Sequence, residues 1–381
     1  FKNILINIFS RFCFFIFILK NNGNNKSTYH FKYIKDIKII MLKNIIYISH
    51  SEKNPSGGAK IIYRHSEKIN TLKNFSSEVL HLKKTRLSKF KTSIKKKIKL
   101  NTKIEDGWQL NEVMPVKKFN YRWFNHKIKT RNYFNFDKKK DFIILPEIFA
   151  HLADDLLIKK RINYAIFVQN GYVIQSTNNE KKLIKAYKKA KFILSYSNDI
   201  TNCINLKFPN LKTKIVKISY SINLKNLRLK NKLNLITYMS RKLPIHSNLV
   251  INYLKPQLPK NWRIKNLNRL TEEQTYKLLK KSKIFLSFSS FEGLGLPPAE
   301  AALARNFVIG YTGEGGNEYW KKPIFTKINS GEITTFVKMV IKKIKELKRN
   351  NQFPLRTYFE LKSKFSKEKE LKNIQNFLKF F

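Results

Sequence analysis

Two carboxylates, Glu292 and Glu300, stand on either side of a loop that contains Gly293 and Gly295. Carboxylate oxygens accept hydrogen bonds from hydroxyl groups, and glycines let a backbone approach a ligand without an intervening Cβ atom. Residues 297–298 are both proline, which is tolerated at a helix start, where the free N–H groups favour a phosphate. The segment therefore predicts a pocket for a ligand that carries both phosphate and hydroxyl groups.

The elements expected on either side would hold this loop at the edge of a sheet. The apolar run 284–288 is typical of a buried parallel strand, and the alanine-rich run 299–304 is typical of a helix. Ligands of α/β folds bind at the carboxyl ends of parallel strands, which is where the loop follows. We expect Glu292 in the loop and Glu300 in the first helical turn, both lining one crevice. The alternative is that Glu300 only complements the helix dipole and Glu292 is a solvated charge.

The same residues carry a family resemblance. Glu292-x7-Glu300, within FEGLGLPPAEA, resembles the E-x7-E motif of retaining glycosyltransferases of the two-domain GT-B fold, the large family 4 type. The likeness covers residues 233–332, including a helix start of capping-box type at 271–274 and the segment 313–318. It implies an α/β fold of two Rossmann-like domains, whose parallel sheets face a central cleft.

The resemblance also implies roles for individual residues. In that family the first glutamate of the motif contacts the donor sugar and the second holds the ribose hydroxyls, which correspond here to Glu292 and Glu300. The residues that follow the first glutamate would belong to the donor pocket, namely Gly293, Leu294, Gly295 and Leu296. The family commonly has a small Cys-Gly pair after the motif helix, whereas this chain has Ala304-Arg305-Asn306, so the family's donor preference does not carry over.

Two cations, Arg241 and Lys242, follow the run 233–239, which resembles the opening strand of a GT-B donor domain. A nucleotide diphosphate leaves as an anion, and Arg offers a bidentate fork where Lys offers a point charge. We expect one of the two to neutralise the leaving group, Arg241 before Lys242. In much of the family this pair is spaced rather than adjacent, and in so basic a chain the alternative is a surface pair.

The first half alternates strand and helix patterns, which favours a parallel sheet, and its strands are predicted at 43–49, 141–147, 164–168 and 192–195. The loop 55–59 leads into a helix predicted at 60–72. Gly57 and Gly58 in this loop would let backbone N–H groups approach a phosphate or the acceptor, although adjacent glycines also form ordinary tight turns. Residues 169–172 lie at the end of a predicted strand, on the edge expected to face the cleft.

Four segments are expected along the chain. We interpret residues 1–40 as a leader or upstream translated sequence, with a membrane anchor as the alternative, because the apolar run 4–19 is shorter than a membrane span. Residues 41–231 would form the acceptor-side domain and residues 232–362 the nucleotide-sugar donor domain. Residues 363–381 would form a helix that crosses back to the first domain, as in many GT-B enzymes.

The net charge of +52 comes from 77 Lys and Arg residues against 25 Asp and Glu residues, a balance that ordinarily favours nucleic acid or an anionic membrane. Because the excess is mostly lysine and accompanies Asn, Ile and Phe, we attribute it to A/T-rich codons and expect no nucleic-acid partner. The lysine-dense segment 83–103 is predicted to be a solvated loop. A peripheral contact with an anionic membrane remains an alternative use of this charge.

Cys13 and Cys203 are the only cysteines, which fits a reducing cytoplasm.

The sequence has no Asp-x-Asp triplet, no His-x-x-x-His motif and no paired cysteines, so we expect no metal and no other cofactor.

The resemblance implies transfer of a hexosyl group, with retention, from a nucleotide-diphosphate sugar to a hydroxyl of a glycan or lipid-linked acceptor, in cell-surface glycan or polysaccharide synthesis. The acceptor attacks on the face from which the phosphate departs, and a phosphate oxygen takes the proton. No protein base is needed, so His65 and His151 receive structural or solvated roles.

Two other functions compete with this interpretation. A GT-B-type epimerase or phosphorylase would share the fold and the sugar-nucleotide or phosphate chemistry without needing a glycan acceptor. A basic nucleic-acid-binding protein would instead use the charge alone, and its binding would fall steeply with salt. The donor sugar, the base, the acceptor and the linkage depend on loop side chains that vary freely on this fold.

Overall fold

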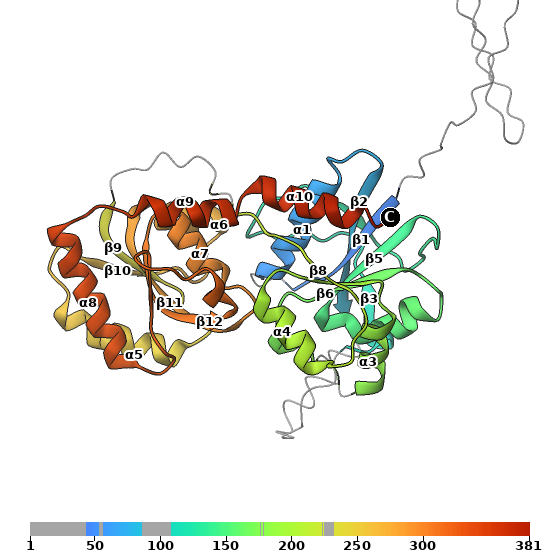
Figure 1. Cartoon of the computed structure of the whole chain (residues 1–381), viewed down its shortest axis with the longest axis horizontal. Coiled ribbons are helices and arrows are strands. Elements are labelled where there is room, and N and C mark those ends of the chain that lie inside the picture. The colour runs from blue at the N-terminus through green and yellow to red at the C-terminus, as the bar shows by residue number, and fades with distance from the viewer. Residues whose placement is uncertain are drawn as a thin grey trace, which may run out of the picture. The chain divides into compact units, whose positions relative to one another are not determined.

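The computed structural model describes residues 43–381 except 53–55, 86–107, 176, 178, 223 and 225–231. Residues 42–381 form one compact unit, which contains two separate β-sheets with helices on both faces of each (Figure 1). The expected leader at residues 1–40 lies outside the described residues, as do Cys13 and most of the lysine-dense segment. Within the described part of the chain, no helix combines the length and the apolar character that crossing a bilayer requires.

The first sheet contains eight strands in the order β3-β2-β1-β5-β6-β7-β8, with β4 paired to β2. All neighbouring strands are parallel except β2 and β3. The strands are β1 (Lys43–His50), β2 (Phe75–Lys84), β3 (Val113–Pro115), β4 (Lys129–Arg131), β5 (Asp141–Pro146), β6 (Tyr164–Phe167), β7 (Phe192–Ser195) and β8 (Ile215–Lys217).

Helices cover this sheet on both faces because its central strands are apolar on both sides. The helical segments are α1 (Gly57–Ile69), η1 (Leu110–Glu112), η2 (Glu147–Leu152), η3 (Asp154–Ile158), η4 (Gly171–Val173), α3 (Glu180–Lys189) and α4 (Asn198–Lys207). Alternate residues of β1 point to opposite faces of the sheet. Tyr47 packs in the core on the face that α1 covers, whereas Ile46 packs in the core on the face that α3 and α4 cover. Burial on both faces explains why β1 is a continuous apolar run.

The second sheet has five strands in the order β10-β9-β11-β12-β13, all parallel. They are β9 (Leu233–Tyr238), β10 (Arg263–Asn266), β11 (Ser282–Glu292), β12 (Phe307–Glu314) and β13 (Phe325–Lys327). The helical segments that come after β9 in the sequence are α5 (Pro244–Leu254), η5 (Lys255–Gln257), α6 (Glu272–Lys281), α7 (Leu296–Leu303), η6 (Gly315–Glu318), α8 (Ile333–Arg349), α9 (Leu355–Lys364) and α10 (Lys367–Leu378). Helices α5 and α8 cover one face, and α6, α7 and α9 cover the other (Figure 1).

Both sheets reverse their strand order at one point. In the second sheet, β9 is followed along the chain by β10 on one side and β11 on the other, so the reversal lies between β9 and β11. The corresponding point of the first sheet lies between β1 and β5. Doubly wound α/β folds bind ligands at the carboxyl ends of the two strands that flank such a reversal. The loops after β9 and β11 are therefore the place to look for a site.

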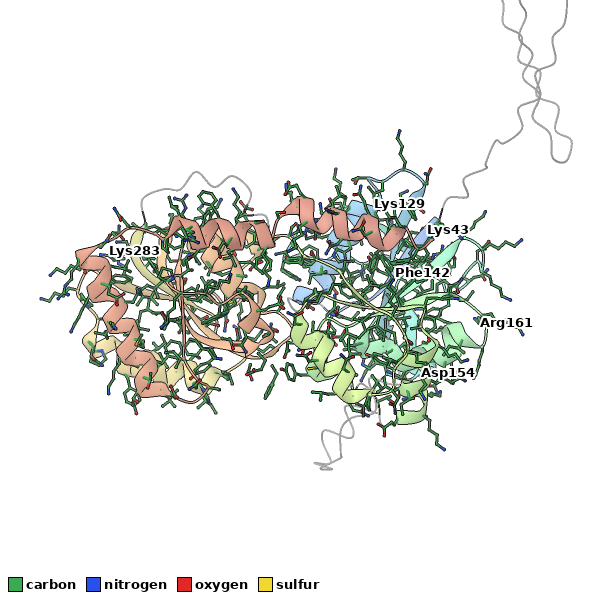
Figure 2. All side chains as sticks on the ribbon, viewed as in Figure 1. Lys43, Lys129, Phe142, Asp154, Arg161 and Lys283 are labelled. Atoms are coloured by element: carbon green, nitrogen blue, oxygen red, sulfur yellow. The ribbon has the colours of Figure 1, made fainter. Side chains whose placement is uncertain are left out.

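The last helix, α10, packs on the first sheet rather than the second. It lies beside α1 (Figure 1), and Phe377 is fully buried in the core that α1 shares with β1 and β5. Phe142 of β5 contacts Phe377, with ring centroids 6.3 Å apart, among the side chains that fill the space between sheet and helices (Figure 2). Glu370 of α10 is also fully buried and pairs with Arg64 of α1 at 3.3 Å.

The expected elements are mostly confirmed. The strands predicted at 43–49, 141–147, 164–168, 192–195 and 233–239 are β1, β5, β6, β7 and β9, and the strand predicted at 284–288 lies inside the longer β11. The capping box at the start of α6 is present, since Thr271 and Gln274 each bond the other's backbone N–H. Two helix predictions had wrong boundaries. The helix predicted at 60–72 is α1, which runs from Gly57 to Ile69, and α7 begins at Leu296, which places Glu300 in the second helical turn.

Candidate active site

The loop between β11 and α7 has an unusual backbone. The pairing of β11 with β12 shifts between Ser289 and Glu292, and Phe291 adopts a left-handed φ of 48° in this bulge. Gly295, the N-cap residue of α7, has a φ of 71°, a conformation that glycine adopts without steric cost. The hydroxyl of Tyr319 donates to the Gly295 carbonyl oxygen, which fixes the loop from the side of η6. The sequence-predicted glycine loop thus lies at the carboxyl end of β11.

Gly293 is one of the points where this loop contacts the first half of the chain. A Cβ atom at Gly293 would collide with the carbonyl oxygen of Gln169, which follows β6. Ser197, the N-cap residue of α4, donates its hydroxyl proton to the Gly293 carbonyl at 2.6 Å. Glycine is required here because two backbones approach closely. Leu294, by contrast, is buried in the core of the second sheet, and Leu296 packs on both cores.

Lys242, rather than Arg241, reaches Glu292. The ammonium Nζ of Lys242 lies 3.3 Å from Glu292 Oε1, and the two side chains are 39% and 26% exposed. Arg241 is exposed to solvent. Since Lys242 follows β9 and Glu292 ends β11, the pair stands at the strand-order reversal of the second sheet. An accessible carboxylate and an accessible ammonium therefore meet where this fold class binds ligands.

Glu300 is buried and engaged by a residue of the first half. Its Oε1 accepts hydrogen bonds from Lys60 Nζ at 3.0 Å and from the Tyr276 hydroxyl at 2.8 Å. Lys60 also pairs with Glu272 of α6 and donates to the Tyr276 hydroxyl at 2.8 Å. One lysine of α1 thus holds two carboxylates that come from α6 and α7.

The electrostatics of this Lys60 cluster follow from burial and pairing. Burial by itself would lower the pKa of Lys60, but Glu300, the surrounding tyrosines and Glu272 outweigh it, and the pKa lies well above its usual range. Burial would raise the pKa of Glu272, but the attraction of Lys60 is stronger and the pKa is lowered. Lys60 is therefore fully protonated, and its positive charge lies beside the carboxyl groups of Glu272 and Glu300.

Solved structures with the same arrangement of elements were found for nearly the whole chain. Anabaena HepE in complex with UDP and glucose has a TM-score of 0.62 at 11% identity, covering 89% of this chain and 100% of HepE. A variant of S. aureus TarM in complex with fondaparinux, alpha-GlcNAc-glycerol and UDP has a TM-score of 0.59 at 12% identity, with 88% and 99% covered. The lipopolysaccharide outer core galactosyltransferase WaaB has a TM-score of 0.55 at 14% identity, with 88% and 99% covered.

The chain has the GT-B fold. The two-sheet α/β architecture expected from the sequence is thereby confirmed, and these identities establish the fold alone. No protein-family model matches the sequence, and the curated proteins contain no match either.

The glycines after β1 belong to helix α1 of this GT-B fold rather than to a loop before it. Ser56 is the N-cap residue and accepts from Ala59 N at 3.4 Å, so Gly57 and Gly58 form the first helical turn. The side chain of Gln169 donates to the Gly58 carbonyl at 3.0 Å, and a Cβ atom at Gly58 would collide with this side chain. The expected acceptor or phosphate loop is therefore a helix start that packs against Gln169. Pro55, which was included in the expected loop, lies outside the described residues.

Residues 169–170 are held by a buried carboxylate that no sequence motif marks. Glu147, directly after β5, accepts the backbone N–H groups of Gln169 and Asn170, each at 3.0 Å. Burial raises the pKa of Glu147 to about 7 although these two N–H groups oppose the shift. Asn170 in turn donates its side-chain amide to the Phe291 carbonyl at 2.8 Å, so the segment fixes the loop that carries Glu292.

Several residues of this region carry no recognisable sequence signal. Lys60 and Glu147 acquire these contacts only when the chain is folded, because their hydrogen-bond partners are 22 to 240 positions away along the chain. Tyr276 reaches Glu272 within α6, but its contacts with Lys60 and Glu300 also require the folded chain. The two histidines left without a role are buried: His65 stacks on Phe167, and His151 bonds the Trp108 carbonyl at 2.7 Å. Among the described residues, no group of three or more His, Cys, Asp or Glu side chains is arranged to hold a metal ion.

Proposed function

We propose that this chain is a glycosyltransferase that moves a sugar from a nucleotide-diphosphate sugar to a hydroxyl acceptor with retention of configuration. The observation that carries the proposal is the placement of Glu292 beside Lys242 at the strand-order reversal, where the glycine loop connects β11 to the helix that carries Glu300. In the GT-B fold, this edge of the second sheet offers a free helix end, a cation and two carboxylates to one ligand.

Each group of the site suits one part of such a donor. The amino end of α7, which begins at Leu296, favours the diphosphate, and Lys242 with Arg241 neutralises the charge of the leaving group. Glu300 accepts from the ribose hydroxyls and Glu292 from the sugar. UDP-sugars are the first candidates, since HepE and the TarM variant were solved with UDP.

The reaction needs no base from the protein. The bond between the anomeric carbon and the diphosphate oxygen breaks, and the acceptor oxygen bonds to the same face of that carbon. The acceptor proton passes to the departing phosphate oxygen, so the products are the glycoside and the nucleotide diphosphate. The chain's own contribution is to orient the sugar through Glu292 and to stabilise the charge that develops on the phosphate through Lys242.

The acceptor class and cellular setting extend this proposal. The acceptor is a glycan or a lipid-linked hydroxyl, the group moved is a hexosyl group, and the process is cell-surface glycan or polysaccharide synthesis. The enzyme acts in the cytoplasm, and its basic surface touches the anionic inner face of the membrane. The nucleotide sugar is a substrate, and no cofactor is required.

Lys60 adds a specific condition to donor binding. Because Lys60 and Tyr276 already donate to Glu300 Oε1, the ribose must use the other carboxylate oxygen or displace Lys60. Donor binding is thereby connected to the contact between α1 and α7.

The test is a thermal-shift screen with UDP-, GDP- and ADP-sugars, followed by product analysis with and without glycan acceptors. A nucleotide sugar that binds the folded state raises Tm by mass action, and transfer should require an acceptor. Product formed without an acceptor would favour the epimerase or phosphorylase alternative. A chain that binds oligonucleotides with a steep salt dependence and ignores every nucleotide sugar would contradict the proposal.

A further inference from the structure

Two aromatic side chains stand exposed next to Glu292. Phe291 directly precedes that glutamate and is 62% exposed, and Tyr172 in η4 is 39% exposed. Their ring centroids lie 5.2 Å apart with an angle of 54° between the ring planes. Exposed apolar side chains that stand singly are ordinary, but two exposed rings in contact form a patch, which is the arrangement that marks binding sites. The pair, which we call the aromatic platform, combines one ring from each half of the GT-B fold.

Both rings are held in place by polar contacts. Asn170 accepts the Tyr172 backbone N–H at 3.0 Å through Oδ1 and donates to the Phe291 carbonyl at 2.8 Å through Nδ2. The Tyr172 hydroxyl donates to Asp199 Oδ1 at 3.1 Å. Since Asn170 is itself anchored by buried Glu147, the platform rests on the interior of the first sheet. A rigid platform loses little conformational entropy when a ligand binds.

The backbone of Phe291 supports a functional interpretation. Its φ of 48° lies in the left-handed region, which is unfavourable for a bulky residue and common at binding sites. The bulge in β11 that includes Phe291 redirects its side chain toward solvent.

Asp199 supports the platform from below. Burial and the nearby charges of Glu314 and Glu318 raise the pKa of Asp199, and Glu318 itself pairs with Lys364 at 2.9 Å. Asp199 Oδ2 is buried and has no hydrogen-bond partner among the described residues, whereas Oδ1 accepts from the Tyr172 hydroxyl. Asp199 therefore fixes the position of the Tyr172 ring.

We infer that Tyr172 and Phe291 form an acceptor subsite for a sugar ring, with Asp199 holding the Tyr172 ring in position. This inference rests on the proposed glycosyltransferase function and makes the acceptor a carbohydrate. The C–H face of a pyranose is apolar and slightly positive, so it packs on the negative faces of aromatic rings, while the hydroxyls at the edge of the sugar stay in water. An acyclic polyol phosphate presents no such face.

The experiment measures sugar binding separately from nucleotide binding. Methyl α-D-glucopyranoside, methyl β-D-galactopyranoside, N-acetylglucosamine, maltotriose and glycerol 3-phosphate are titrated into the full chain by saturation-transfer NMR, with and without saturating UDP. Tyr172→Leu and Phe291→Leu remove each ring, and Phe291→Leu keeps a side chain at the same strained φ. Tyr172→Phe and Phe291→Tyr retain the rings. Tyr253→Leu is the control, since Tyr253 is 55% exposed on α5.

At least one pyranoside should bind, and either leucine variant should weaken it by about tenfold while UDP affinity stays unchanged. The ring-retaining variants and Tyr253→Leu should bind the pyranoside like the original chain. Equal pyranoside affinity in the leucine variants, or no pyranoside binding while UDP binds, overturns the subsite. Preferential binding of glycerol 3-phosphate that depends on Tyr172 also overturns it. Failure of UDP and every nucleotide sugar to bind counts instead against the proposed function.

Discussion

At the scale of single residues, the two motif glutamates differ in environment. Glu292 is part exposed and faces a part-exposed lysine, whereas Glu300 is buried and already accepts two hydrogen bonds. A side chain that acts at the departing phosphate must be accessible to the substrate and must lie in a charged environment. A side chain that binds the nucleotide is instead best held in a fixed position as a hydrogen-bond acceptor. The difference between the two carboxylates leads to a division of labour that can be measured.

Glu300→Gln should weaken UDP binding by about tenfold or more, because a hydrogen bond to an ionised group contributes roughly 1.5–3 kcal/mol. Glu292→Gln should leave UDP affinity nearly unchanged and lower turnover. Titrations of UDP and of an intact UDP-sugar against both variants separate the two effects. If both variants lost only a little affinity, and equally for both ligands, the two carboxylates would be ordinary surface charges without the proposed roles.

Lys60→Met should destabilise the fold by about 3 kcal/mol, because it leaves Glu272 and Glu300 close together without their buried counter-charge. Lys338→Met on the exposed side of α8 is the matched control and should change the free energy of unfolding by less than about 0.5 kcal/mol. Urea denaturation measures both. Indistinguishable midpoints for the two variants would show that the Lys60 cluster contributes no net stability.

At the scale of elements, the segment after β6 depends on a carboxylate whose proton affinity changes on folding. Burial raises the pKa of Glu147 to about 7 from a usual value of 4.5. The folded state therefore binds this proton more tightly than the unfolded state. The corresponding stabilisation is complete below about pH 4.5 and is lost as the pH rises toward 7.

Glu147→Gln should remove that pH dependence. Relative to that of the variant, the free energy of unfolding of the original chain should fall by about 3 kcal/mol between pH 4.5 and pH 7.5. The buried His65 and His81, whose pKa values burial lowers to about 4 and about 3, act in the opposite direction, and taking the difference cancels them. Urea unfolding at both pH values is the measurement, and a constant difference would contradict the assigned pKa.

Helix α10 provides a second prediction at this scale. Phe377→Ala should destabilise the chain by about 3–5 kcal/mol, because Phe377 is fully buried between Phe142 and Phe192 and its removal leaves a cavity. Phe359→Ala in neighbouring α9 is the control, since Phe359 is 56% exposed. Equal Tm values for the two variants would mean that α10 is not part of the first sheet's core in solution.

Local patterns predicted most elements of this fold, and they did so for physical reasons. Strands such as β1 and β5 are buried on both faces, so their apolar runs are unambiguous. The motif around Glu292 combined a strand end, glycines and a helix start within a few residues. Lys60 gave no such signal, because a lysine on an amphipathic helix is ordinarily solvated and its partners lie more than 200 positions away. The boundary of α7 was misjudged because Pro297 and Pro298 follow a first helical residue, Leu296.

At the scale of the whole molecule, the proposed chemistry relies on side chains and a helix end to stabilise the leaving diphosphate. Activity and UDP affinity should stay within about twofold after treatment with EDTA, since Lys242, Arg241 and the start of α7 supply the positive charge. Turnover measured before and after chelation, and again with added Mg²⁺ or Mn²⁺, checks this. An absolute requirement for either ion would contradict the proposed way of stabilising the diphosphate.

The position of α10 also affects the order in which the chain becomes folded during synthesis. Domains near the amino terminus ordinarily fold first as they leave the ribosome. Here, α1 covers one face of the first sheet together with a helix that is translated after the entire second sheet, and that later helix brings the buried Ile374, Phe377 and Leu378. The apolar face around Phe142 must therefore wait, exposed or held by a chaperone, until the ribosome has passed residue 378. Slowing translation between β8 and α10 should accordingly increase aggregation of the nascent chain.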